Sequence, residues 1–253
     1  MFRLVKVPIL FVCTLFVINV LSVNVHADDV YYTNNNGVSM TEKQYNFFGE
    51  LYFDGYQEYV TQDKYNKYLT IGLYDQKIIK KETEDFETGV VSPQALIHET
   101  TAKKLTLTYV CSDKYCSMVT SLQWKGKPKV ISYDVIGSYL YGNITRDNTP
   151  TTYLNWSGQS IVFTDRVYSG NGFGCTVLLQ NSSTAMQIVQ EVDVYVTGDG
   201  TFYSSYQHAT KKITLETSKK YTTGYGGDGG VFFFYGSAVG VYDQMGGVNV
   251  HLS

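Results

Sequence analysis

From Lys103 to the C-terminus the sequence repeats one pattern, in which apolar and polar residues alternate over short runs separated by Gly, Asn, Asp or Ser. The first run sets Leu105, Leu107 and Tyr109 against intervening threonines. Alternation with a period of two is typical of a strand with one buried face. The other runs are 116–124, 129–141, 160–167, 173–180, 186–197, 201–208, 211–215, 231–235 and 247–252. Because no helical pattern intervenes, we predict a mainly β fold, with an antiparallel β-sandwich or jelly-roll-like domain over 103–253.

One run differs from the others because both of its faces are apolar. The residues Val231-Phe232-Phe233-Phe234-Tyr235 leave no side for solvent, which predicts a central strand. The Gly-rich stretch 224–230 comes directly before this run and is expected to be a mobile loop.

Two cysteines flank a predicted hairpin turn. If residues 112–115 form a four-residue loop, Cys111 lies opposite Cys116 and Tyr109 lies opposite Met118. Directly opposed cysteines can meet the geometry of a disulfide, which export would allow to form. A metal site would need a second Cys or His pair nearby. We therefore predict a structural disulfide between Cys111 and Cys116 and no metal.

The segment 28–75 carries a different pattern, one that predicts helices. Thr41 followed by Gln44 fits a capping box, and a similar motif begins again at Thr61. We expect two short capped helices in a hairpin, which are too short to be stable alone. The favoured interpretation is a cover packed on the β domain, and the alternative is a docking module. Residues 76–102 are expected to be a linker.

The first 27 residues have the layout of a secretory signal peptide. Arg3 and Lys6 precede an apolar stretch, and small Ala27 precedes Asp28 at the expected cut. The alternative is an uncleaved membrane anchor, since the apolar run approaches the length of a membrane span. We predict cleavage between Ala27 and Asp28, and hence a secreted, extracellular protein without a transmembrane span in the mature chain.

The charge of the mature chain argues against nucleic acid as a partner. Loss of the two basic residues of the signal segment leaves 18 Lys and Arg against 23 Asp and Glu. An acidic chain without a long Lys/Arg cluster has no overall attraction to phosphate backbones. We therefore expect no nucleic acid among its partners.

Three short segments resemble those of a family of secreted proteins. They are Asn34-Asn35-Asn36-Gly37-Val38-Ser39-Met40-Thr41-Glu42-Lys43-Gln44-Tyr45, Ser132-Tyr133-Asp134-Val135-Ile136-Gly137 and Ser205-Tyr206-Gln207-His208-Ala209. They are similar to segments of uncharacterised secreted proteins of low-GC Gram-positive bacteria, often gut bacteria. That family has no known activity. The resemblance thus implies export from a Gram-positive cell and no site residue.

Cys175 is left over once the other two mature cysteines are paired. A secreted cysteine hydrolase needs a thiolate beside a histidine, which His98, His208 or His251 could supply. No local motif marks Cys175 as a nucleophile, and Cys is commonly buried as a small hydrophobic residue. We therefore expect Cys175 to be structural.

Other polar residues were weighed as candidate sites. Glu191 and Asp193 form a carboxylate pair, which we expect on a solvated face of a sheet. His208 and His251 could share a metal ion, but dispersed histidines are more typical of separate core or surface positions. Asn155 begins a glycosylation sequon and is expected in a loop. No catalytic residue, metal or cofactor is therefore predicted.

The abundance of tyrosine supports a binding function. The chain has 23 Tyr, a side chain that combines a large contact area with a hydrogen-bonding tip. Tyr203, on a strand, and Tyr225, in the Gly-rich loop, are the candidate contacts. We expect a secreted, non-enzymatic protein that binds a cell-surface glycan, cell wall or protein. The alternatives are a secreted cell-wall or glycan hydrolase and a toxin or pore-former.

Overall fold

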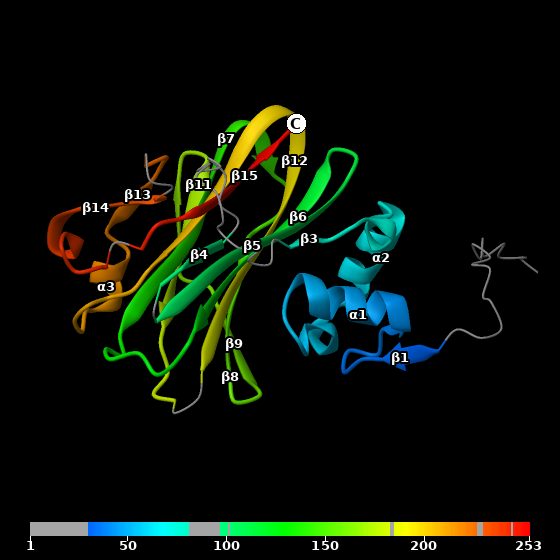
Figure 1. The fold of residues 1–253 in the computed structure, drawn as a ribbon, viewed down its shortest axis with the longest axis horizontal. Helices are drawn as coiled ribbons and strands as arrows, with labels where there is room; N and C mark the ends of the chain where they lie inside the picture. The colour runs from blue at the N-terminus through cyan, green and yellow to red at the C-terminus, as the bar shows by residue number, and fades with distance from the viewer. Residues whose placement is uncertain (1–29, 81–96, 101, 183–184, 227–229, 244) are drawn as a thin grey trace, which may run out of the picture. The chain divides into compact units, whose positions relative to one another are not determined.

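The alternating runs form an antiparallel β-sandwich around one long strand, β12 (Met186–Gln207). Four strands hydrogen-bond to it: β6 (Tyr115–Trp124), β7 (Tyr133–Arg146), β8 (Thr151–Trp156) and β15 (Val248–Leu252). The first half of β12 pairs with β6 and β8, and the second half with β15 and most of β7. The register shifts between Val196 and Gly200. Such an irregularity bends a strand, so β12 contributes to both layers (Figure 1).

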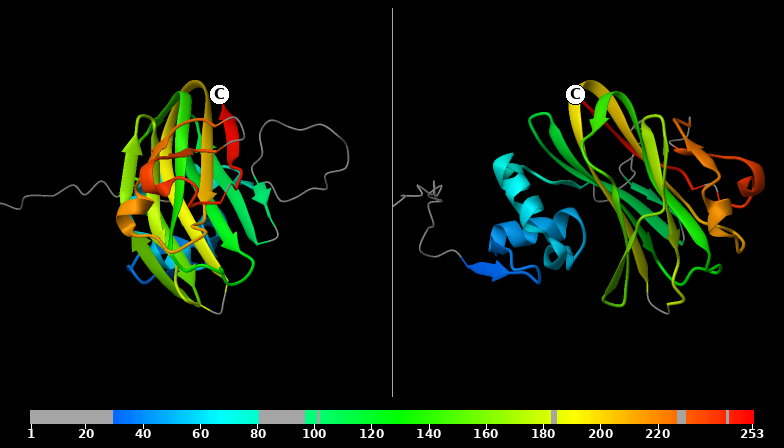
Figure 2. Two further views of the ribbon diagram at one scale, coloured as in Figure 1. Left: turned by 90° about the vertical axis from the view of Figure 1, so that its left-hand side faces the viewer. Right: turned by 180° about the vertical axis from the view of Figure 1, so that it is seen from behind.

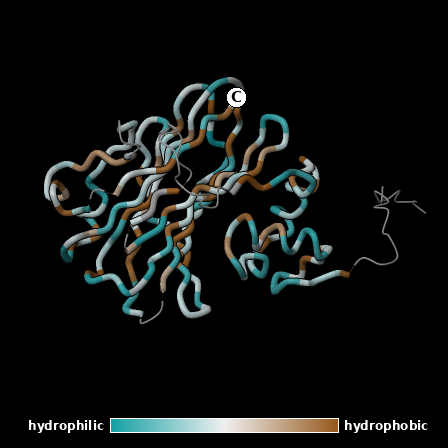
Figure 3. The backbone as a smooth tube through the Cα atoms, viewed as in Figure 1, coloured by the Kyte–Doolittle hydropathy of each residue, from teal (hydrophilic) through white to brown (hydrophobic). Residues whose placement is uncertain are grey.

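The remaining strands extend the two layers. They are β3 (Ile79–Lys80), β4 (Ile97–Glu99), β5 (Lys103–Ser112), β9 (Gln159–Phe163), β10 (Arg166–Ser169) and β11 (Gly172–Leu178). One layer adds β3, β4 and β5 beside β6, and β9 beside β8. The other adds β11 and β10 beside β7. The main core, which includes Leu105, Met118 and Phe202, takes alternate residues from the long strands (Figure 3).

The computed structural model describes residues 30–80, 97–100, 102–182, 185–226, 230–243 and 245–253. The predicted signal peptide and its cleavage site lie outside these residues, as does most of the predicted linker. The parts of that linker that are described include β3 and β4, which both pair with β5. No helix in the described residues is long and apolar enough to cross a membrane.

The predicted register of the Cys111–Cys116 hairpin is confirmed. Cys111 lies opposite Cys116 and Tyr109 opposite Met118, and the two sulfur atoms form a disulfide. The loop is shorter than the predicted four residues, because the outer two of those positions also pair across the hairpin. The turn closes through Asp113, whose φ of 52° lies in the left-handed region that Asp tolerates.

Two predictions about strands are wrong. Residues 211–215 are not a strand but lead into α3 (Leu215–Ser218), which Thr214 caps. The aromatic run forms β14 (Phe232–Phe234), which pairs with β13 (Tyr221–Thr223) in a separate two-stranded sheet and not within the sandwich. Its apolar residues pack flat on a strand face of the sandwich, and not between strands.

Glycines make this close packing possible. Gly137 of β7 lies opposite Gly174 of β11, and a Cβ atom at either position would come within 2.9 Å of the Phe232 ring. Larger residues would push the C-terminal segment off the sheet. This segment, which includes α3, β13 and β14, therefore covers part of the outer face of the β7 layer (Figures 1 and 2).

The N-terminal segment is helical, as predicted. It contains β1 (Tyr31–Thr33), β2 (Ser39–Thr41), α1 (Glu42–Leu51), η1 (Tyr56–Tyr59), α2 (Gln62–Thr70) and η2 (Leu73–Asp75). Thr41 and Gln44 form the predicted capping box, and the Thr61 side chain accepts a hydrogen bond from the backbone of Lys64. Both helices thus begin where the repeated motif places them.

The helical segment is a cover on the sandwich. Phe48, Tyr52 and Tyr68 pack against Val119 of β6 and Val189 of β12, on the outer face of the first layer. Figures 1 and 2 show the helices on one side of the strands and the C-terminal segment on the opposite side. The favoured interpretation of the helical hairpin is therefore confirmed.

Candidate functional site

The outer face of the second layer has an open region next to the C-terminal segment. Along β12 the even-numbered residues Phe202 and Ser204 are buried inside the sandwich, so Thr201 and Tyr203 point outward. Directly opposed residues of neighbouring antiparallel strands share a face. Two rows therefore lie side by side: Tyr139–Tyr203–Asn249 and Tyr141–Thr201–His251.

The loop after β13 adds one more aromatic ring to these rows. Tyr225 packs against Tyr203 with 4.7 Å between ring centroids. Tyr141 and Tyr225 are exposed, at 59% and 52%, while Tyr203 is half-buried beneath them. Burial raises the pKa of Tyr203 above its ordinary value. The structure thus brings together the two tyrosines that the sequence singled out. We call these seven residues the tyrosine face.

The tyrosine face combines aromatic area with small polar groups. Thr201 and His251 lie within hydrogen-bonding distance, with 3.4 Å between Oγ1 and Nδ1. Exposed aromatic rings beside such groups can stack on an apolar surface and bond its polar edge. Sequence reasoning missed Tyr141 and His251. The signal lay in the alternation of the flanking strands, because correct pairing with β12 places both residues beside Thr201.

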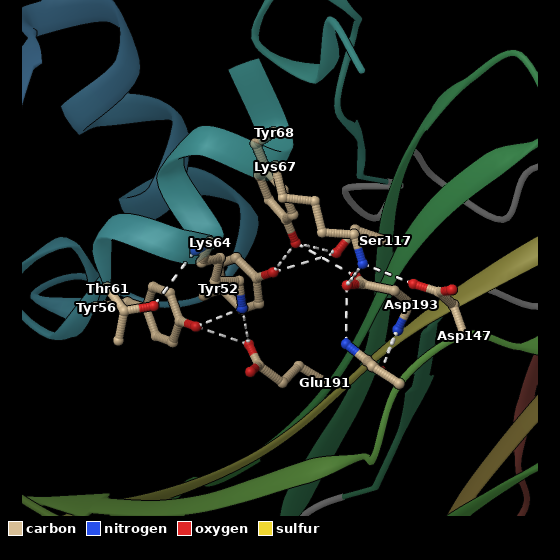
Figure 4. A network of polar contacts seen from close by, with 11 residues as sticks. Tyr52, Tyr56, Thr61, Lys64, Lys67, Tyr68, Ser117, Asp147, Glu191 and Asp193 are labelled. Atoms are coloured by element: carbon tan, nitrogen blue, oxygen red, sulfur yellow. Dashed lines mark hydrogen bonds and ion pairs between the residues drawn. The ribbon is translucent and has the colours of Figure 1, made fainter. Parts of the chain in front are cut away.

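The opposite outer face is closed by a buried ionic network (Figure 4). Glu191 of β12 accepts hydrogen bonds from the Tyr56 hydroxyl at 2.8 Å and from Lys64 Nζ at 2.7 Å. Lys64 Nζ also lies 4.3 Å from the centroid of the Tyr52 ring. Both charged side chains are largely buried, with 18% of Lys64 and 11% of Glu191 exposed. The pair fixes α2 to the sheet.

A second acidic side chain continues this network along β12. Asp193 accepts hydrogen bonds from Lys67 Nζ at 3.3 Å and from Asn148 Nδ2 at 2.8 Å. Lys67 also pairs with Asp147 at 2.6 Å. Burial lowers the pKa of Lys67, but its hydrogen bond to Asp147 and the charge of Asp193 outweigh burial, so the pKa is raised.

The expectation of a solvated carboxylate pair is therefore wrong. Glu191 and Asp193 are buried because α2 covers them and supplies two lysines. Lys64 and Lys67 are three residues apart, which puts both on one face of a helix. That spacing was the signal in the sequence, but only the packing of α2 on the sheet shows which carboxylates they meet.

The hydroxyl groups around the network are buried as well. The Tyr68 hydroxyl lies 2.7 Å from Ser117 Oγ and also contacts the Tyr52 hydroxyl. Burial raises the pKa of Tyr52, Tyr56 and Tyr68 well above the ordinary value of 10.0. These tyrosines hold the helices on the sheet and are not available to a ligand.

A third polar cluster joins two of the segments on which the family resemblance was based. Asp134 is fully buried, and its oxygens lie 3.0 Å from His208 Nδ1. It also accepts hydrogen bonds from the Tyr206 hydroxyl and the Ala209 backbone. Burial raises the pKa of Asp134, although the hydrogen bond with His208 opposes the shift. His208 lines a cavity of about 500 Å³.

Cys175 and the histidines do not form a shared site. Cys175 Sγ contacts the main-chain carbonyls of Phe163 and Thr176 in the core. Burial raises the pKa of its thiol to about 11, which keeps the sulfur protonated at neutral pH. His208 and His251 bond to different partners. Within the described ranges, no three His, Cys, Asp or Glu side chains are grouped to hold a metal ion.

Comparisons with known proteins find a similar fold in surface proteins of bacteria. The KRT10-binding region domain of the pneumococcal serine-rich repeat protein PsrP is 9% identical, with a TM-score of 0.33, and the match covers 52% of this chain and 86% of that chain. For the RrgA Jo.In complex the values are 11%, 0.33, 52% and 84%. For the collagen-binding domain of a Staphylococcus aureus adhesin they are 8%, 0.30, 53% and 86%. No family model and no curated protein matches the chain.

Proposed function

We propose that this chain is a secreted, non-enzymatic protein that binds a cell surface through its tyrosine face. The observation that carries this proposal is the association of Tyr203 with Tyr225 beside exposed Tyr141, on an outer sheet face that the described parts of the chain leave open. The ligand is a glycan or a protein of a cell surface or cell wall. Export follows from the predicted cleavage between Ala27 and Asp28.

The physical case depends on the use of the aromatic residues. A half-buried tyrosine under an exposed one has few conformations, so it loses little entropy when a ligand covers it. Thr201, Asn249 and His251 supply donors and acceptors at the edge of the aromatic area. A flat aromatic patch with polar neighbours is the arrangement that recognises an extended surface.

The experiment is a pull-down on isolated Gram-positive cell walls, together with a glycan array, using the secreted protein. The variant Tyr203→Ala/Tyr225→Ala removes the association and should reduce binding by about 10-fold or more, since aromatic anchors dominate binding energy. Tyr235→Ala is the matched control, because Tyr235 is exposed to the same 52% as Tyr225 but lies outside the tyrosine face.

Two results would contradict the proposal. Equal binding by the double variant and the control would remove the tyrosine face from the interaction. Turnover of wall material by the pure protein would contradict the non-enzymatic function. The intact mass of the secreted product tests export separately, because a mass that retains residues 1–27 would mean an uncleaved anchor.

A hydrolase is the second candidate, and one observation favours it. His208 is oriented by buried Asp134 and lines a cavity that also includes Lys103 and Thr210. A histidine held by a carboxylate can act as a general base. Release of sugar or peptide from cell walls, abolished in His208→Asn, would establish this function. Absence of release, or equal release by that variant, would exclude it.

A further inference from the structure

A second cavity lies on the other side of the molecule, between the helical segment and the sheet. It has a volume of about 430 Å³, within the range of ligand pockets. One wall comes from η1 and the residues before it, and the other from the β8–β9 hairpin and the start of β12. The hairpin closes through Ser157 and Gly158, which both have positive φ, as a tight two-residue turn requires.

Asn155 of β8 is the unusual residue of this cavity. Its Oδ1 and Nδ2 atoms are buried, and neither has a hydrogen-bond partner in the part of the chain that the structure describes. The neighbouring amide does not satisfy it, because Gln187, directly opposite on β12, donates to Ser121 at 2.8 Å. An unpaired buried carboxamide costs stability and therefore calls for a partner. Asn155 lies in a strand, so the predicted loop is wrong.

The other lining groups define the chemistry of that partner. Asp54 projects a carboxylate, and Gln123 and Gln159 contribute further amides, while Tyr59 and Trp156 supply aromatic rings. Amides both donate and accept hydrogen bonds, which matches the paired donor and acceptor character of hydroxyl groups. Aromatic rings offer an apolar surface for the C–H face of a sugar ring. None of the described lining residues is Lys or Arg, so the cavity lacks a counter-charge for an anion.

We propose that this cavity binds an uncharged saccharide unit. Asn155 bonds adjacent hydroxyls through its two polar atoms, Asp54 accepts from a third, and Trp156 packs on the ring. The site is separate from the tyrosine face and does not depend on it. The two sites would let one molecule hold a sugar and a surface at once.

The test is an array of neutral mono- and oligosaccharides, with uronic and sialic acid glycans as charged controls, followed by calorimetric titration of the neutral glycans that bind. Asp54→Asn should weaken binding by about 10-fold or more, because a charge-assisted hydrogen bond is lost. Asp113→Asn, an exposed hairpin-turn substitution, should leave binding unchanged.

Asn155→Leu separates a binding role from a structural one. This near-isosteric change should abolish saccharide binding and leave the melting temperature unchanged or raised, because the amide has no partner to lose. A lower melting temperature with unchanged binding would overturn the proposal, as would binding of acidic glycans alone or of no neutral glycan. Tyr203→Ala/Tyr225→Ala should keep saccharide affinity, which distinguishes this cavity from the tyrosine face.

Discussion

The two outer faces of the sandwich use the same residue type in opposite ways. On the helix-covered face, Tyr52, Tyr56 and Tyr68 are buried, and burial raises their pKa values. On the tyrosine face, Tyr141 and Tyr225 are exposed. The difference teaches that a high tyrosine content does not by itself mark a binding surface. What decides the role of each tyrosine is whether another segment covers it.

Charge separates the two faces as well. The covered face buries Glu191 and Asp193, which are matched by lysines of α2. The sheet residues of the tyrosine face carry no such buried pair; their charged neighbour, Asp199, lies 3.8 Å from His251 at an exposed position. Buried ion pairs need a partner segment to compensate desolvation, whereas an open face can await an external ligand.

Raising the pH should have the largest effect, and it acts on the covered face. Buried tyrosines keep their protons in the folded state, while the unfolded chain ionises near pH 10. Stability is therefore complete below about pH 10 and falls above it, by up to about 1.4 kcal/mol per buried tyrosine and pH unit. Urea unfolding between about pH 8 and pH 12, with tyrosinate absorbance, measures this. Titration of every tyrosine near pH 10 without unfolding would contradict the burial of these rings.

Removing one partner of the ionic network should have the next largest effect. Glu191→Leu leaves the Lys64 ammonium largely buried without its carboxylate, so we expect a loss of about 3–5 kcal/mol in the free energy of unfolding. Glu191→Leu/Lys64→Met should recover most of it, because a well-packed apolar pair replaces both charges. Denaturant unfolding of the two variants tests this order.

The control for that experiment is Lys43→Ala. It breaks an ion pair with Asp75 whose side chains are 68% and 79% exposed, so we expect a loss of at most about 1 kcal/mol. Equal losses from Glu191→Leu and Lys43→Ala would mean that the network does not hold the helical segment on the sheet.

The disulfide should have a smaller effect, at the edge of the covered face. Cys111→Ala/Cys116→Ala should cost about 2 kcal/mol, because the cross-link closes only a short loop. The adjacent Ser112 hydroxyl donates to the Ile71 carbonyl at 2.6 Å, so the hairpin end also contacts the helical segment. Urea unfolding measures the loss. A loss as large as that of Glu191→Leu would mean that the hairpin end, and not the ionic network, anchors the helices.

The sequence was sufficient where local chemistry determines structure. The capping motifs at Thr41 and Thr61 and the register at Cys111 depend on residues close in the chain, and the structure confirms them. It was insufficient where distant segments meet. The burial of Glu191 depends on α2, more than 100 residues earlier, and the aromatic run at 232–234 packs on a sheet whose glycines alone signalled the contact.

The candidate site was partly predictable for the same reason. Strand alternation placed Tyr203 on one face, but the ring of Tyr225 reaches it from a loop that no periodicity positions. Tyr141 and His251 join the face only through the pairing of β7 and β15 with β12.

The most direct test of the account is tyrosine nitration of the secreted protein with and without bound cell walls, read out by peptide mass mapping. The account predicts that Tyr141, Tyr203 and Tyr225 lose reactivity on binding, while exposed Tyr59 and Tyr235 do not change. Protection of Tyr59 or Tyr235 with continued modification of Tyr141 and Tyr225 would contradict the tyrosine face as the contact surface.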